Sequence, residues 1–117
     1  MIPTKTGCVQ GDALRKKTGF KVTMFFPLYN NEGNVYGEEV WKWWRERLTV
    51  LLQGFTEMGV VNGWWLGHSD QNRWIVAVVR TEKEVGHIRD FLRLACAKFE
   101  QKAMYLDYHS VRFEEVT

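Results

Sequence analysis

Cysteine is scarce in this sequence of 117 residues, and long apolar runs are absent from it. The two cysteines, Cys8 and Cys96, have neither a C-x-x-C pattern nor zinc-ligand spacing, and nothing in their placement supports a disulfide. No segment approaches the length that spans a bilayer, and the N-terminal segment lacks the apolar stretch of a signal peptide. These absences exclude a membrane-spanning helix and a secretory leader, so we expect a soluble protein of the cytoplasm.

An excess of charge is also missing, because the net charge at pH 7 is only +2. So small an excess does not argue for nucleic acid or an anionic membrane as partner, and the basic run 15–17 is typical of a solvated flank. No glycine-rich loop leads into a helix, so there is no phosphate-binding loop. His87 and Asp90 share a helical face without a third ligand. We therefore predict no cofactor, no metal site and no membrane partner, and we consider nucleic acid unfavoured.

Aromatic residues, in contrast, are abundant: six Trp, seven Phe and four Tyr. Aromatic side chains at this density are typical of cores, interfaces and apolar pockets. The length is that of one domain with a core of its own. Residues 1–18 show no strong periodicity and are interpreted as a tail or docked arm, whereas residues 19–117 are predicted to form a single domain.

The hydrophobic periodicity changes several times along the chain. Residues 19–29 alternate, with Phe20, Val22, Met24, Phe26 and Leu28 on one face, as in a strand packed against helices. A helical period follows over 38–55. Two strands are then predicted over 60–66 and 73–79, joined by a polar turn at 68–72. A second helix follows the capping box Thr81-x-x-Glu84, and a last strand is predicted over 103–113. Ser110 is interpreted as a turn or bulge before a short extra C-terminal strand at 111–115.

The predicted order is therefore strand, helix, strand, strand, helix, strand. This βαββαβ order is typical of α+β ferredoxin-like folds, in which a four-stranded antiparallel sheet carries two helices on one face. The RNA-recognition motif shares this order, but 72–79 lacks its basic and aromatic signature, so RNA binding is only a third hypothesis.

The face of the sheet without helices is predicted to be rich in aromatic residues. It carries Phe25 and Tyr29 from the first strand and Tyr105 from the last, with either Trp64 or Trp65 from the hairpin. We take Trp65 as the candidate. So much aromatic surface favours either a homodimer or higher homo-oligomer, or a pocket for an apolar or aromatic small ligand.

Few residues are candidates for catalysis. His68, Ser69 and Asp70 are adjacent in a predicted turn and cannot line up as nucleophile, base and acid. Asp107 and His109 are neighbours on one face of a strand, so the carboxylate could orient the imidazole. They form the best acid–base candidate, with Tyr105 beside them.

The run LTVLLQGFTEMGVVNGWWLG and the later run FEQKAMYLDYHSVRF resemble a loose group of small, uncharacterised bacterial proteins. In that group a helix leads to a GG-x-T…G-x-W segment, and the last strand opens with Q-x-A-V-Y. The matching positions are Gly54, Phe55, Thr56, Trp64, Trp65, Gln101, Ala103, Met104 and Tyr105. One glycine stands where the group has two. The resemblance implies a ferredoxin-like fold and adds no catalytic residue.

Two functional hypotheses remain open. The first is a non-enzymatic, homo-oligomeric binding or regulatory domain that uses its open sheet face. The alternative is a small cofactor-free enzyme of the dimeric α+β barrel type, with an apolar pocket and the Asp107–His109 pair. Trp43 and Val50 form a second apolar stripe on the first helix, and we expect another chain or the N-terminal arm to cover Trp43.

Overall fold

The computed structural model describes residues 16–117, which form an α+β fold of four antiparallel strands and two helices. The elements are, in chain order, β1 (Lys16–Pro27), α2 (Glu38–Leu52), β2 (Thr56–Trp65), β3 (His68–Val79), α3 (Glu82–Lys98) and β4 (Tyr105–Glu114). In the sheet the strands lie in the order β2-β3-β1-β4, so β2 and β4 are the edge strands. This arrangement is consistent with the predicted ferredoxin-like fold. None of the described helices is both long enough and apolar enough to span a membrane.

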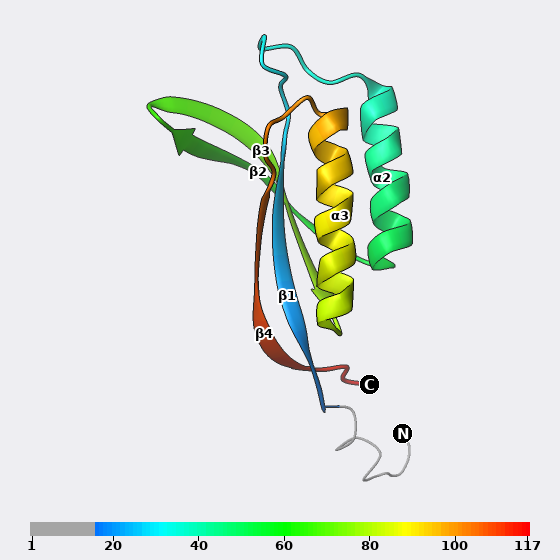
Figure 1. Cartoon of the computed structure of the whole chain (residues 1–117). Helices are drawn as coiled ribbons and strands as arrows, with labels where there is room; N and C mark the ends of the chain where they lie inside the picture. The colour runs from blue at the N-terminus through cyan, green and yellow to red at the C-terminus, as the bar shows by residue number, and fades with distance from the viewer. Residues whose placement is uncertain (1–15) are drawn as a thin grey trace.

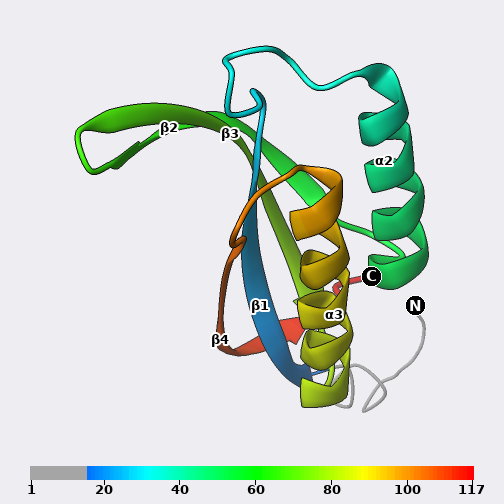
Figure 2. The same ribbon diagram turned by 45° about the horizontal axis from the view of Figure 1, so that its top comes forward.

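Both helices lie on one face of the sheet (Figures 1 and 2). The side chains of β1 alternate as predicted. Val22, Met24 and Phe26 face the helices and are fully buried, whereas Thr23 and Phe25 are half-buried on the other face. On β3 the same alternation places Ile75 beneath the helices, where it is fully buried. The core between sheet and helices is therefore apolar, and the opposite face stays open.

The two helices begin where the sequence predicts them. The Thr81 side chain accepts a hydrogen bond from the backbone N–H of Glu84, and the Glu84 side chain accepts one from the backbone N–H of Thr81, so the predicted capping box is confirmed. Glu38 opens α2 in the first turn, where the helix dipole favours an acidic side chain. The helix ends at Leu52, earlier than predicted, because Gln53 adopts a left-handed conformation with φ of 59°.

The predicted turn between the hairpin strands was wrong. The chain reverses at Leu66 and Gly67, which both have positive φ, of 49° and 83°. Positive φ at both central residues is the signature of the tight two-residue hairpin turn. Residues 68–72 are consequently not a turn but the first part of β3, which extends the β2–β3 hairpin beyond the helices (Figure 1).

The predicted extra C-terminal strand was also wrong. β4 runs without a break from Tyr105 to Glu114 and pairs with β1 along its whole length, so Ser110 lies inside a strand opposite Phe20. The long pairing is available because β1 begins at Lys16, before the boundary predicted at Gly19. The predicted tail otherwise lies in residues 1–15, which fall outside the described residues together with Cys8.

Candidate functional site

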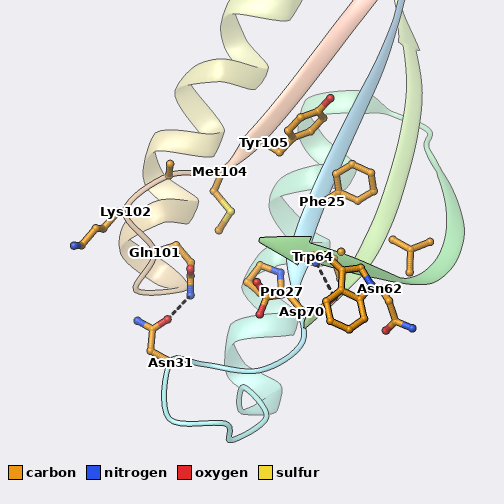
Figure 3. A pocket seen from close by; sticks show the side chains of 14 residues that line it. Phe25, Pro27, Asn31, Asn62, Trp64, Asp70, Gln101, Lys102, Met104 and Tyr105 are labelled. Atoms are coloured by element: carbon orange, nitrogen blue, oxygen red, sulfur yellow. Dashed lines mark hydrogen bonds between the residues drawn. The ribbon is translucent and has the colours of Figure 1, made fainter. Parts of the chain in front are cut away.

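A pocket of about 880 Å³ lies on the open side of the sheet, where β1 ends beside the β2–β3 hairpin and the α3–β4 loop (Figure 3). Its volume is within the range of small-molecule sites. It is lined by Phe25, Pro27, Asn31, Val61, Asn62, Gly63, Trp64, Asp70, Asn72, Gln101, Lys102, Ala103, Met104 and Tyr105. Apolar and aromatic side chains thus share the pocket with four uncharged amide side chains, one carboxylate and one ammonium group.

Two of the lining residues, Phe25 and Tyr105, belong to a row of aromatic rings across three neighbouring strands. Phe25 on β1 lies opposite Trp74 on β3 and opposite Tyr105 on β4. The ring centroid of Phe25 is 6.4 Å from that of Trp74 and 5.3 Å from that of Tyr105, and both pairs are tilted. On β2 the position opposite Trp74 is Gly59, at a bulge with φ of 107°, so no side chain continues the row. The rings therefore present a half-exposed apolar surface.

The hairpin and the α3–β4 loop form the two sides of the pocket. Figure 3 shows Trp64 and Asn62 of β2 on the hairpin side and Gln101, Lys102 and Met104 on the loop side. Trp64 is 74% exposed. The β2–β3 register places Gly63 opposite Asp70, so the hairpin also brings a carboxylate to the pocket. A ligand between the two sides would meet an indole, several amides and a negative charge.

The loop side is held by hydrogen bonds centred on Gln101. The two hydrogens of its Nε2 are shared among three acceptors: Asn31 Oδ1 at 3.3 Å, the Tyr36 hydroxyl at 3.1 Å and the Phe99 carbonyl at 3.2 Å. The Tyr36 hydroxyl itself donates to the Phe99 carbonyl at 2.6 Å. Burial raises the pKa of Tyr36, so the phenol keeps its proton near neutral pH. This network fastens the β1–α2 loop to the α3–β4 loop.

The carboxylate of the predicted acid–base pair has a different hydrogen-bond partner in the structure. Tyr105 Oη donates to Asp107 Oδ2 at 2.7 Å, and this hydrogen bond raises the pKa of Tyr105 above its ordinary value. His109 is exposed on the edge strand, opposite Lys21, and it does not line the pocket. Within residues 16–117 no hydrogen bond joins Asp107 to His109. The partner of the carboxylate is therefore a phenol rather than an imidazole.

The other predicted site residues are scattered. Phe25 and Tyr105 line the pocket, whereas Tyr29 lies beyond the end of β1, exposed and bridged to Val35. Trp65 pairs with His68 beside the hairpin turn, and its side chain lies outside the described residues.

Trp43 and Val50 lie on the helix side of the molecule, away from the pocket. Trp43 is half-buried and stacks on Phe91 of α3, with ring centroids 5.6 Å apart. The charged groups of Arg47 and Lys98 lie 5.8 and 5.6 Å from the Trp43 ring centroid. Val50 is 82% exposed. Part of the cover on Trp43 thus comes from its own chain, and cover by another chain stays a prediction.

Sequence reasoning missed the amide groups of the pocket. Asn62 and Asn72 were assigned to a strand and a turn with no role, because the hairpin turn was placed in the wrong position. Asn31 lies between the predicted first strand and the predicted first helix, in a segment without a predicted role. Gln101 did carry a signal, since it opens the segment that resembles the bacterial group. Its contacts, however, join residues 65 to 70 positions apart, which periodicity does not reveal.

Comparison with known proteins gives a structural likeness only. Neither a family model nor a curated protein matches the chain. One similar solved structure is a phage SAM lyase in complex with S-methyl-5'-thioadenosine. It superposes with a TM-score of 0.54 at 13% sequence identity, over 98% of this chain and 97% of that chain. The likeness shows a shared fold along nearly the whole of both chains.

Proposed function

We propose that this protein is a small cofactor-free lyase that binds S-adenosylmethionine in the open-face pocket and releases S-methyl-5'-thioadenosine. The observation that carries the proposal is the composition of the pocket, in which aromatic rings and amide groups surround a space large enough for a nucleoside. The likeness in fold to a SAM lyase that holds S-methyl-5'-thioadenosine supports it. Of the two hypotheses from the sequence, the proposal takes the small enzyme with its pocket and gives no role to the Asp107–His109 pair.

The pocket suits both halves of such a ligand. Purine rings stack on aromatic side chains, and Phe25, Trp64 and Tyr105 offer three ring faces. A sulfonium cation is attracted by the electron-rich faces of the same rings. Asp70 supplies a negative charge for the amino group of the substrate, and Lys102 supplies a positive charge for its carboxylate.

The proposed reaction needs little acid or base catalysis. Release of S-methyl-5'-thioadenosine breaks the bond between sulfur and the four-carbon chain, and the electron pair of that bond goes to sulfur. A positively charged sulfonium thus becomes a neutral thioether. Because a lyase adds no water, the carbon forms its new bond within the substrate. Either its own carboxylate oxygen attacks and closes a lactone, or a neighbouring C–H loses its proton to water and a carbon–carbon double bond forms. Low polarity around the sulfonium disfavours the charged reactant more than the less charged transition state, so the aromatic side chains of the pocket favour the step.

The test is the conversion of S-adenosylmethionine to S-methyl-5'-thioadenosine by the purified protein, followed by chromatography against a protein-free control. We expect Phe25→Ala to lower the rate at least tenfold, because it removes the central ring of the aromatic row. Val78→Ala is the matched control, since Val78 lies on the same face outside the pocket, opposite Lys21. Product formation no faster than in the protein-free control would refute a lyase. Ligand binding without turnover would instead favour the non-enzymatic binding domain.

We also propose that the protein is a homo-oligomer whose contacts include the tip of the β2–β3 hairpin. The tip leaves Trp64 and Leu66 exposed, by 74% and 84%, which is apolar surface that a second copy could cover. Leu66→Asn tests this, because asparagine tolerates the positive φ of the turn while it removes the apolar side chain. Light scattering should give a smaller particle for the variant than for the wild type. A wild-type protein of monomer mass would overturn the proposal.

A further inference from the structure

The orientation of the Gln101 side-chain amide is determined by its neighbours. The Phe99 carbonyl can only accept a hydrogen bond, and the Tyr36 hydroxyl uses its own proton to donate to that carbonyl. Both groups therefore act as acceptors towards Gln101. Asn31 is also an acceptor towards Gln101, because its Nδ2 donates to the Glu100 carbonyl and its Oδ1 is left to accept. The NH2 group of Gln101 must therefore face these three acceptors, and its carbonyl oxygen must point away from them.

The Gln101 carbonyl oxygen is consequently a fixed acceptor without a donor in the described part of the chain. The other amides of the pocket are arranged differently. Both ends of the Asn31 amide are used within the network. Asn72 makes one hydrogen bond of 3.5 Å, to the Asp70 carbonyl. Gln101 is thus the lining amide whose donor end is anchored by several partners while its acceptor end is unoccupied.

Fixed polar groups select ligands more strongly than mobile ones. A side chain that is already held in place loses little rotational freedom when a ligand binds. A site with a fixed acceptor discriminates against a ligand that has no matching donor, because the acceptor is then desolvated without compensation. Gln101 lines the loop side of the pocket together with Met104, and Phe25 and Tyr105 of the aromatic row line the same pocket (Figure 3).

We propose that Gln101 is a specificity-determining residue, whose side-chain carbonyl oxygen accepts a hydrogen bond from the 6-amino group of an adenine base stacked on the aromatic row. This inference rests on the proposed function, because it assumes that the pocket takes an adenine nucleoside. It adds a base preference: adenine binds better than a purine that lacks the amino group. Asn31 and Tyr36 act as positioning residues through Gln101.

The experiment compares two probes by calorimetry: S-methyl-5'-thioadenosine, and its analogue with hydrogen in place of the 6-amino group. We expect the wild type to bind the adenine compound about tenfold more tightly, the value of one hydrogen bond to a fixed acceptor. Gln101→Leu should lose that preference while it still binds the analogue. Gln71→Leu is the matched control, since Gln71 is exposed on the hairpin and does not line the pocket, and it should keep the full preference.

The possible failures are distinguishable. If the wild type binds both probes equally well, the base preference is wrong and the proposed function stands. If the wild type binds neither probe, the proposed function fails and the inference fails with it. If Gln101→Leu keeps the preference for adenine, another group binds the 6-amino group, and Gln101 is not the specificity-determining residue. The wild-type comparison alone decides the preference even if Gln101→Leu does not fold.

Discussion

Phe25 and Phe26 are adjacent in β1, and their side chains point to opposite faces of the sheet. Alanine substitutions at the two positions therefore distinguish damage to the core from damage to the pocket. Phe26 is fully buried, with Trp44, Phe91 and Phe99 at centroid distances of 5.4, 6.1 and 5.9 Å. Removing a buried phenyl ring loses its transfer free energy and leaves a cavity, so Phe26→Ala should lower the free energy of unfolding by about 3–5 kcal/mol.

Phe25 is half-buried and contacts only the rings of Trp74 and Tyr105 among the described aromatic residues. Its ring is partly in water already, so Phe25→Ala should cost about 1–2 kcal/mol, from lost apolar area and two ring contacts. The unfolded chains of the two variants are nearly identical in composition, which removes most differences in the reference state.

Urea unfolding followed by circular dichroism measures both costs. The same samples are then titrated with S-methyl-5'-thioadenosine. We expect Phe26→Ala to lose stability and keep most of its affinity, and Phe25→Ala to keep most of its stability and lose affinity. If Phe25→Ala costs as much stability as Phe26→Ala, the open face is buried and cannot hold the proposed pocket.

Three further predictions concern local features. Asp107→Asn should lower the pKa of Tyr105 towards its ordinary value, because the carboxylate that holds the phenolic proton is gone; ultraviolet titration of tyrosinate follows this, and an unchanged midpoint would contradict the hydrogen bond. Thr81→Ala should lower the free energy of unfolding by about 1 kcal/mol, and Thr81→Ser should restore most of it; equal losses in chemical denaturation would mean that the cap is not the cause. Gly67→Ala should cost about 1 kcal/mol, because an L-residue at φ of 83° is strained; an unchanged melting temperature would show that the turn relaxes.

The sequence predicted the features that depend on local periodicity and on contact with the helices. Alternation in β1 separates Val22, Met24 and Phe26 from Phe25, because a strand with one face against a core cannot slip by one residue without exposing it. The T-x-x-E pattern at Thr81 predicts the start of α3, since both hydrogen bonds of the box lie within four residues.

Features far from the core were harder to predict. The hairpin extends beyond the helices, so its residues need no apolar face, and the polar run 68–72 resembles a turn although it is a strand. Asp107 and His109 do share a strand, but only the order of strands puts His109 on an exposed edge. The Gln101 network depends on long-range contacts to Asn31 and Tyr36, which no local pattern encodes.

A nuclear magnetic resonance titration shows most directly whether the open-face pocket is the functional site. The uniformly ¹⁵N-labelled protein is titrated with S-methyl-5'-thioadenosine, and the shifted amide signals are mapped on the fold. We expect the largest shifts at Phe25, Trp64 and Gln101, which all line the pocket. Shifts centred on Trp43 and the helix side, or no shifts at millimolar ligand, would contradict the account.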